Sequence, residues 1–302
     1  MNNKRILITG INGFIGRNLA KYLGDSFPQA AVFGVARTCQ SQEGRYLQAD
    51  LLDKEALDRV IREIQPDVVF HLAGVIFSRD WTEFYQGNVE TTINVLEAVK
   101  KSQYPTRIII PGSAAEYGKV DTAYLPLLEE QEPNPISPYG VSKLWQTTTA
   151  RYYASQGLDV VMGRIFNVIG PGVPQGLSIG AFLNQLKKIK SGELPPRIEV
   201  GNLKPKRDFL DILDVCQAMV ALASSGKGGE IYNICSGASV SMEVILEMMI
   251  TALGVNPEVV GMPERIRPAD IDDIYGDNSK LVTQTGWSRR IQLEESIRRI
   301  TC

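Results

Sequence analysis

Arg5-Ile6-Leu7-Ile8-Thr9-Gly10-Ile11-Asn12-Gly13-Phe14-Ile15-Gly16 joins a short apolar run to three evenly spaced glycines. The run at residues 5–8 predicts a buried strand, and residues 14–23 predict the helix that follows it. The glycines permit a tight turn, close approach of backbone to a pyrophosphate, and close helix packing. The N-terminus of the helix then faces the negative charge. The stretch therefore predicts a dinucleotide-binding turn.

Short apolar runs alternate with helical stretches along the following residues. Further strands are predicted at residues 31–35, 46–48, 66–70 and 107–110, with a long helix near residues 88–101 before the last of them. This alternation is typical of a parallel sheet with helices on both faces. We therefore expect an α/β protein with a Rossmann-type doubly wound parallel sheet and a smaller α/β substrate lobe.

The second predicted strand, at residues 31–35, is followed by Ala36-Arg37 and carries no carboxylate at its end. An acidic residue there would bind the ribose 2′-hydroxyl of NAD, whereas an arginine suits a 2′-phosphate. We predict NADP(H) as the preferred cofactor, with NAD(H) also possible, and a charge-assisted contact from Arg37 to the 2′-phosphate. A solvated surface arginine is the alternative.

Two other strand ends carry polar residues. Asp50 follows residues 46–48, and its carboxylate could accept from the adenine amino group, or it could cap the helix that starts near Asp53. His71 stands between apolar neighbours, which favours a buried structural role over a catalytic one. The predicted cofactor contacts are Gly10, Asn12, Gly13, Phe14, Ile15, Gly16, Arg37, Asp50, Leu51, Leu72, Ala73, Gly74, Tyr139, Lys143 and Val168.

Composition favours a cytoplasmic enzyme that acts on small molecules. The 302 residues are 44% hydrophobic, enough for a large core, and the formal net charge of -2 argues against a nucleic-acid partner. No apolar stretch is long enough to span a membrane, and the N-terminus does not read as a signal peptide. One histidine and four cysteines without ligand spacing (Cys39, Cys216, Cys235 and Cys302) predict free thiols and no metal site.

Tyr139 and Lys143 stand four residues apart in Ser137-Pro138-Tyr139-Gly140-Val141-Ser142-Lys143, at the start of a predicted helix. Positions i and i+4 share a helix face, so the phenol and the ammonium can point into one site. A nearby cation favours the phenolate, which would lower the tyrosine pKa. Ser113 ends the strand at 107–110 and can hydrogen-bond a substrate carbonyl. Ser113, Tyr139 and Lys143 are therefore the predicted catalytic residues.

These motifs together resemble the nucleotide-sugar branch of the extended short-chain dehydrogenase/reductase family. The resemblance covers nearly the whole length and adds Arg164-Ile165-Phe166-Asn167, Lys206-Arg207-Asp208-Phe209 and Arg267-Pro268-Ala269-Asp270 to the motifs above. It implies that Asn167 contacts the sugar or its phosphates, and that Arg207 and Arg267 bind the diphosphate. The substrate contacts expected are Ser113, Ala114, Tyr139, Asn167, Arg207, Arg267 and Asp270.

The residues after Ser113 separate the reactions found in this branch. Ala114 and Ala115 occupy the positions where 4,6-dehydratases of this family carry Asp and Glu, so that elimination has no obvious acid or base. Two readings remain, an NADPH-consuming 4-ketoreductase and a 4-epimerase with tightly bound NAD. Arg37 favours net reduction. A non-catalytic dinucleotide sensor is a third reading, although such proteins usually lack the tyrosine or the lysine.

Two segments look like the GDP-4-keto-6-deoxy-D-mannose reductases that form GDP-D-rhamnose. They are Glu199-Val200-Gly201-Asn202-Leu203 and Tyr232-Asn233-Ile234-Cys235-Ser236-Gly237. One departure is Val168, where those reductases often have histidine. This resemblance predicts reduction of the 4-keto group of a nucleotide-linked 4-keto-6-deoxy sugar, with the GDP-linked sugar as substrate. Tyr139 would donate the proton, and Ser113 would orient the carbonyl.

We expect residues 1–166 to form the dinucleotide-binding domain and residues 167–302 the nucleotide-sugar-binding lobe. The resemblance also implies that part of 207–222 returns to the first domain. Helices near 88–101 and 138–155 look like the pair that forms the dimer interface in relatives, so a homodimer is expected. Burial of the same helices within one chain is the alternative.

Overall fold

The computed structural model describes residues 1–38, 45–265 and 271–302 of the chain. Cys39 and the motif Arg267-Pro268-Ala269-Asp270, both discussed above, lie outside this part.

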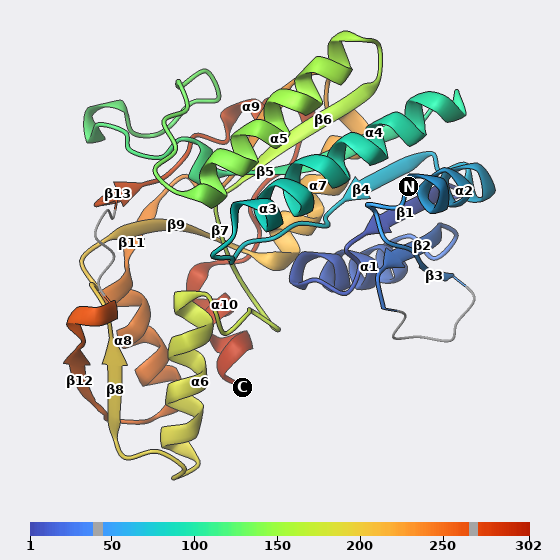
Figure 1. Cartoon of the computed structure of the whole chain (residues 1–302). Helices are drawn as coiled ribbons and strands as arrows, with labels where there is room; N and C mark the ends of the chain where they lie inside the picture. Colours follow the sequence, from blue (N-terminus) through green and yellow to red (C-terminus); the bar gives the residue numbers. More distant parts are fainter. Residues whose placement is uncertain (39–44, 266–270) are drawn as a thin grey trace.

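A seven-stranded parallel sheet forms the larger part of the molecule, as predicted (Figure 1). Its strands run in the order β10-β6-β5-β4-β1-β2-β3, and each neighbouring pair is parallel. Their bounds are β1 Arg5–Thr9, β2 Ala31–Ala36, β3 Tyr46–Gln48, β4 Val68–His71, β5 Arg107–Ser113, β6 Asp159–Ile165 and β10 Ile231–Ile234. Because all strands point the same way, their carboxyl ends form one edge.

Helices cover both faces of this sheet, and β1 shows why. Ile6 and Ile8 pack into one core cluster, whereas Leu7 between them packs into the other, because neighbouring side chains of a strand point to opposite faces. The helices on the Ile6 side are α1 Phe14–Ser26, α7 Ile212–Ser225 and α9 Ser279–Thr285. Those on the Leu7 side are α2 Lys54–Ile64, α4 Thr91–Ser102 and α5 Pro138–Ser155.

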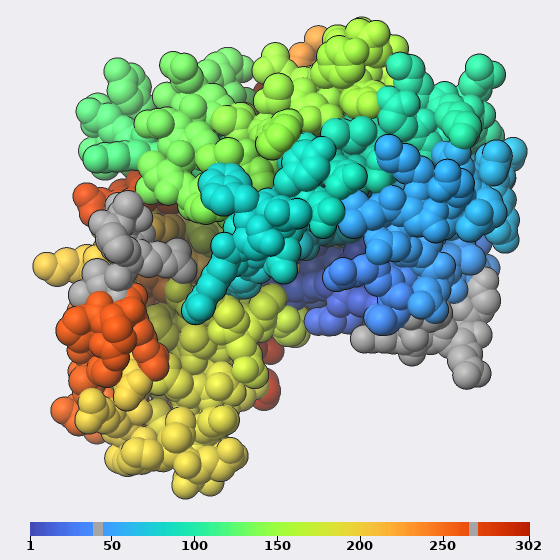
Figure 2. Space-filling view, in the orientation of Figure 1, coloured from blue at the N-terminus to red at the C-terminus, as the bar shows by residue number. Residues whose placement is uncertain are grey.

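A second, smaller lobe stands beside the carboxyl edge of the sheet, with its own hydrophobic core (Figures 1 and 2). Its strands are β7 Asn167–Ile169, β8 Arg197–Val200, β9 Lys206–Asp211, β11 Ser239–Ser241, β12 Glu258–Gly261 and β13 Asp273–Ile274. Its helices are α6 Ser178–Lys190, α8 Met242–Leu253 and α10 Leu293–Thr301. Between its strands, α7 and β10 run back to the main sheet.

The helical segment expected near residues 88–101 begins earlier than predicted. Helix α3 spans Trp81–Phe84 and continues through a π-helical segment, Tyr85–Glu90, into α4. Asp80 supplies the start signal, since its carboxylate accepts from the Thr82 backbone N–H at 2.8 Å. Short 3₁₀ segments lie at Ala114–Glu116, Thr122–Tyr124 and Pro263–Arg265.

Within the described residues, no helix combines the length and the apolar character needed to cross a membrane. Over the same residues, no group of histidine, cysteine and acidic side chains is arranged to hold a metal ion.

Candidate active site

The glycine turn between β1 and α1 brings backbone against backbone. Gly10 has a φ of +68°, and a Cβ there would lie 2.6 Å from the backbone N of Ala73. A Cβ on Gly16 would lie 2.4 Å from the carbonyl oxygen of Gly10. Helix α1 starts after Gly13 without a side-chain cap, and Phe14 and Ile15 line the adjacent cleft. The turn therefore leaves helix N–H groups for an anion, as a dinucleotide pyrophosphate requires.

A cleft of about 540 Å³ runs from this turn, past the carboxyl ends of the strands, into the smaller lobe. Figure 2 shows the smaller lobe, yellow to orange, at the lower left, separated by an open notch from the blue N-terminal part of the chain at the right. Many of the predicted contact residues line the cleft: Gly13, Phe14, Ile15, Gly16, Leu72, Ala73, Gly74, Ser113, Tyr139, Lys143, Asn167, Val168 and Arg207. Residues from both halves of the chain therefore face one space, within the size range of ligand pockets.

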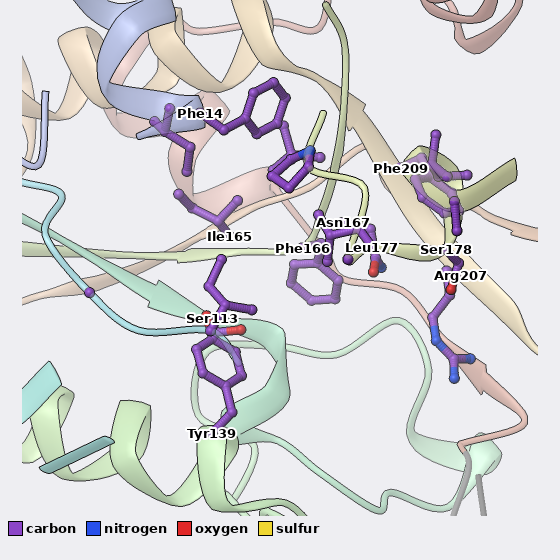
Figure 3. A pocket seen from close by; sticks show the side chains of 18 of the residues that line it. Phe14, Ser113, Tyr139, Ile165, Phe166, Asn167, Leu177, Ser178, Arg207 and Phe209 are labelled. Carbon is purple, nitrogen blue, oxygen red and sulfur yellow. The ribbon is translucent and has the colours of Figure 1, made fainter. Parts of the chain in front are cut away.

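Ser113 and the tyrosine–lysine pair meet at one end of this cleft. Ser113 is the last residue of β5, and helix α5 begins at Pro138 with Ser137 accepting from the Gly140 N–H at 3.1 Å. Figure 3 shows the ring of Tyr139 rising from α5 toward Ser113. Lys143, one turn further along, donates to the Pro111 carbonyl and to the Gln146 side chain.

The tyrosine pKa differs from the sequence expectation. Burial raises the pKa of Tyr139 to about 12, and the negative charge of Glu116 adds to the rise, although a hydrogen bond with Ser113 lowers it in part. Burial also lowers the pKa of Lys143 to about 8, and Glu116 opposes that shift. At neutral pH the tyrosine is therefore a proton donor beside a cation.

Glu116 fixes the position of Ser113 at the end of β5. Its carboxylate accepts from the Ser113 backbone N–H at 2.7 Å and from Arg164 Nε at 2.9 Å. Both charged side chains are almost fully buried, and the Arg164 guanidinium lies 4.6 Å from the centre of the Tyr117 ring. Glu116 does not line the cleft. This carboxylate therefore does not replace the acid and base that Ala114 and Ala115 lack.

His71 is fully buried, as predicted, between Thr9 and Thr92. Its two ring nitrogens lie 2.8 and 2.9 Å from the hydroxyl oxygens of these threonines. Burial, reinforced by the charge of Lys143, lowers the pKa of His71 to about 3, so the ring is neutral at physiological pH.

Several predicted cofactor residues do not line the cleft. Arg37 is exposed just after β2. The Asp50 carboxylate accepts from the Leu52 N–H at 3.0 Å, and Asp53 rather than Asp50 caps α2. Leu51 is buried in the sheet core and offers its carbonyl to Asn94. The other two are Gly10, at the turn, and Asn12, whose amide donates to the Thr38 carbonyl. Ala114, a predicted substrate contact, is buried and does not line the cleft either.

On the opposite side of the cleft, β7 and β9 bring two of the predicted substrate residues together. Asn167 pairs with Phe209 in the parallel register, and its amide donates to the Asp208 carbonyl at 3.1 Å. Arg207 lies on β9, and its guanidinium donates to the Lys206 and Ile271 carbonyls at 2.7 and 2.6 Å. Figure 3 shows Asn167 between the tyrosine end of the cleft and Arg207.

Several polar residues of the cleft region were not predicted from the sequence. Asn88, in the π-helical segment, bonds the Val75 backbone and the Ser142 hydroxyl. Gln146 follows Lys143 by one helical turn, and that spacing could have indicated it. Glu199 and Arg265 form an ion pair of 2.7 Å at the cleft wall in the smaller lobe. Their contact joins residues far apart in sequence, which no local pattern indicates.

Residues 6–235 match the model of the NAD dependent epimerase/dehydratase family, and the chain belongs to this family. The match covers the main sheet and continues through β10, the last strand to join it. The expected family membership is therefore confirmed.

Within this family, the chain is similar to several nucleotide-sugar enzymes of known name or structure. GDP-6-deoxy-D-mannose reductase of Pseudomonas aeruginosa is 34% identical over 98% of this chain and 96% of its own length. UDP-arabinose 4-epimerase 1 of Arabidopsis thaliana is 27% identical over 97% of this chain and 77% of its own length. The structure of RMD from Pseudomonas aeruginosa complexed with NADPH matches with a TM-score of 0.89 and 32% identity, covering 99% of this chain and 98% of the other.

Proposed function

We propose that this protein is an NADPH-dependent nucleotide-sugar 4-ketoreductase. It reduces the 4-keto group of a nucleotide-linked 4-keto-6-deoxy sugar, with GDP-4-keto-6-deoxy-D-mannose as substrate and GDP-D-rhamnose as product. The observation that carries this proposal is the meeting of Ser113, Tyr139 and Lys143 in a cleft that also contains the glycine turn. The reductase of Pseudomonas aeruginosa and the NADPH complex support the same reaction.

The residues at this end of the cleft suit proton delivery to a carbonyl oxygen that is being reduced. Bound NADPH would supply the hydride to carbon 4. Tyr139 is protonated at neutral pH because its pKa is about 12, so its phenol can donate to the oxygen as negative charge develops there. Ser113, at the end of β5, holds the same oxygen in place.

Lys143 contributes positive charge rather than a proton at neutral pH. Its pKa of about 8 keeps the ammonium largely charged at pH 7. Its bonds to Pro111 and Gln146 fix it at the cleft surface, where it would hold ribose hydroxyls and stabilise the tyrosine as it loses its proton.

The substrate would bind against the side of the cleft that is formed by β7 and β9. Asn167 would contact the sugar or its phosphates, and Arg207 would bind the diphosphate, because both line the cleft and a guanidinium matches phosphate oxygens in pairs. Arg267, Asp270 and Ala114 complete the proposed substrate contacts, and the first two lie outside the described residues.

We propose NADP(H) as the preferred cofactor, with NAD(H) as a weaker substitute. The glycine turn fits the pyrophosphate of either, so the preference rests on Arg37, which stands exposed after β2 without a carboxylate beside it. Asn12, Asp50 and Leu51 stay proposed cofactor contacts, although none of them lines the cleft.

The decisive experiment follows NADPH absorbance with the GDP-linked 4-keto-6-deoxy sugar. Wild-type protein should consume NADPH, and Tyr139→Phe should lower the rate about 10³-fold or more while NADPH still binds, because one proton donor is lost. Tyr124→Phe, an exposed tyrosine outside the cleft, is the matched control. Near-normal turnover by Tyr139→Phe would contradict the mechanism.

A 4-epimerase with tightly bound NAD is the alternative, favoured by the similarity to UDP-arabinose 4-epimerase 1. An epimerase returns its hydride to the sugar and shows no net loss of NADPH. The same assay therefore separates the two reactions, and absence of any turnover with a panel of nucleotide 4-keto sugars would favour a non-catalytic sensor.

We further propose that residues 1–166, with part of 207–222, bind the dinucleotide, and that residues 167–302 bind the nucleotide sugar. Helix α7, Ile212–Ser225, packs on the main sheet, which supports the return of part of 207–222. Strand β10 joins that sheet as well, although it lies outside 207–222.

A homodimer is proposed through the helices at 81–102 and 138–155. Their outer surface exposes four large aromatic side chains, Trp81, Tyr85, Trp145 and Tyr152, and the rings of Tyr85 and Trp145 lie 5.2 Å apart. Such a patch is typical of an association surface. Sedimentation should give a dimer for wild type and a monomer for Trp145→Glu; a monomeric wild type would contradict this assignment.

A further inference from the structure

The far end of the cleft carries a carboxylate where the ligand is expected to be anionic. Among the described residues that line the cleft, Glu199 is the only acidic one, and the other charged residues are Lys143, Arg207 and Arg265. A carboxylate facing a dinucleotide and a nucleotide diphosphate weakens binding through charge repulsion, unless the ligand offers it hydrogen-bond donors. Its position therefore calls for a donor group on the ligand.

The backbone holds Glu199 firmly in this position. Ile198 and Val200 on either side are buried in the lobe core, so the alternation of strand β8 turns the Glu199 side chain to the other face. Gln185 of α6 bonds both the N–H and the carbonyl of Glu199, at 3.0 and 3.1 Å. The same backbone carbonyl also accepts from Arg265 at 2.8 Å.

Arg265 adds a cation beside the carboxylate. Its guanidinium donates to Glu199 Oε2 at 2.7 Å, and both side chains remain partly exposed, at 43% and 38%. One edge of this pair therefore presents hydrogen-bond acceptors, and the other presents donors. The pair can therefore bind the edge of a flat ligand that places donors opposite the carboxylate and an acceptor opposite the guanidinium.

We infer that Glu199 and Arg265 recognise the guanine base of the substrate, which makes Glu199 a specificity-determining residue. The N1–H and N2 amino group of guanine are adjacent donors that a carboxylate accepts in parallel, and the neighbouring O6 accepts from a guanidinium. Adenine places an acceptor at N1 and a donor at N6, which opposes both contacts. Uracil and thymine offer one N–H between two carbonyl acceptors. Guanine alone matches the pair.

This inference rests on the proposed function, because it assumes that the cleft binds a nucleotide diphosphate. It is tested by titration calorimetry with free GDP, IDP and ADP in the presence of NADP⁺. IDP retains O6 and N1–H but lacks the N2 amino group, so it removes one of the two contacts to the carboxylate. Wild type should bind GDP more tightly than IDP, and IDP more tightly than ADP.

Glu199→Gln is the test variant, because it keeps the shape of the side chain but turns one acceptor oxygen into a donor. It should weaken GDP binding roughly 10-fold or more, and it should reduce the preference for GDP over IDP and ADP. Glu258→Gln, on the paired strand β12 and away from the cleft, should bind as wild type does. Unchanged NADP⁺ affinity of each variant shows that the fold is intact.

Equal binding of GDP and ADP by wild type, or an unchanged preference in Glu199→Gln, would overturn the assignment to guanine. Either result leaves the reductase proposal standing if NADPH is consumed with any nucleotide-linked 4-keto-6-deoxy sugar. Loss of that turnover with GDP preference intact would instead contradict the reductase and keep the base assignment.

Discussion

Two guanidinium–carboxylate pairs flank the cleft, one in each lobe, with almost equal separations and very different burial. Arg164 and Glu116 lie 2.9 Å apart beneath Ser113, with side chains 4% and 0% exposed. Arg265 and Glu199 lie 2.7 Å apart on the wall of the smaller lobe, 43% and 38% exposed. The nitrogen–oxygen distance therefore does not distinguish the roles of the two pairs. Their burial and their other hydrogen-bond partners do.

The buried pair has its bonding groups committed within the protein. Glu116 holds the Ser113 N–H, and Arg164 also donates to the Glu129 carbonyl and stacks on Tyr117. A ligand cannot reach it, so its effect passes through the position of Ser113. In the exposed pair, Arg265 donates only to the carbonyl and the carboxylate of Glu199 in the contacts given above. The partly exposed polar edges of this pair remain available to a ligand.

Removing the cation from each pair should give the largest difference in stability. Arg164→Met leaves the Glu116 charge buried and unpaired, which should lower the free energy of unfolding by about 3–5 kcal/mol. Arg265→Met should change it by about 1 kcal/mol or less, because exposed ion pairs contribute little. Urea unfolding of the two variants measures both values.

A double variant tests whether the loss in Arg164→Met comes from the unpaired charge. Glu116→Gln combined with Arg164→Met should recover part of the lost stability, because no buried charge then lacks a partner. Equal costs for Arg164→Met and Arg265→Met would show that burial does not separate the two pairs.

The sequence predicts most of the catalytic end of the cleft, because its determinants are local. The glycine turn, the strand end at Ser113 and the i, i+4 spacing of Tyr139 and Lys143 each depend on a few consecutive residues. Helix α5 has the predicted bounds, 138–155. The parallel sheet follows from the alternation of apolar runs and helices.

Non-local features were missed or predicted in the wrong direction. Arg164 meets Glu116 across 48 positions of the chain, and Arg265 meets Glu199 across 66. The tyrosine pKa was expected to fall because a cation is near in sequence, but it rises because the folded chain buries the phenol. Burial is a property of the assembled fold, and a spacing pattern does not contain it.

Arg37, like Arg265, is exposed. Its removal should therefore change cofactor binding and leave the stability of the fold unchanged. Arg37→Ala should weaken NADPH binding about 10-fold while NADH binding stays nearly unchanged, because only NADPH carries the 2′-phosphate. Thermal unfolding without cofactor should match wild type. Fluorescence titration with both cofactors gives the ratio, and an unchanged preference for NADPH would remove Arg37 from the cofactor site.

The smallest expected effect comes from the negative charge of Glu116, which raises the pKa of Lys143. With a pKa of about 8, Lys143 is cationic below that pH and loses its proton as the pH rises through it, so turnover should fall on the alkaline side. Glu116 raises the lysine pKa, and His71, which feels the charge of Lys143, is neutral in this pH range.

Glu116→Gln keeps an oxygen for the Ser113 N–H but removes the charge. The alkaline fall of kcat should therefore begin at lower pH than in wild type, with a modest change at pH 6.5, where Lys143 is cationic in both proteins. A purely structural role would lower kcat equally at every pH. The pH profile thus separates the two contributions of the buried pair, the position of Ser113 and the charge state of Lys143, which stability measurements on Arg164→Met combine.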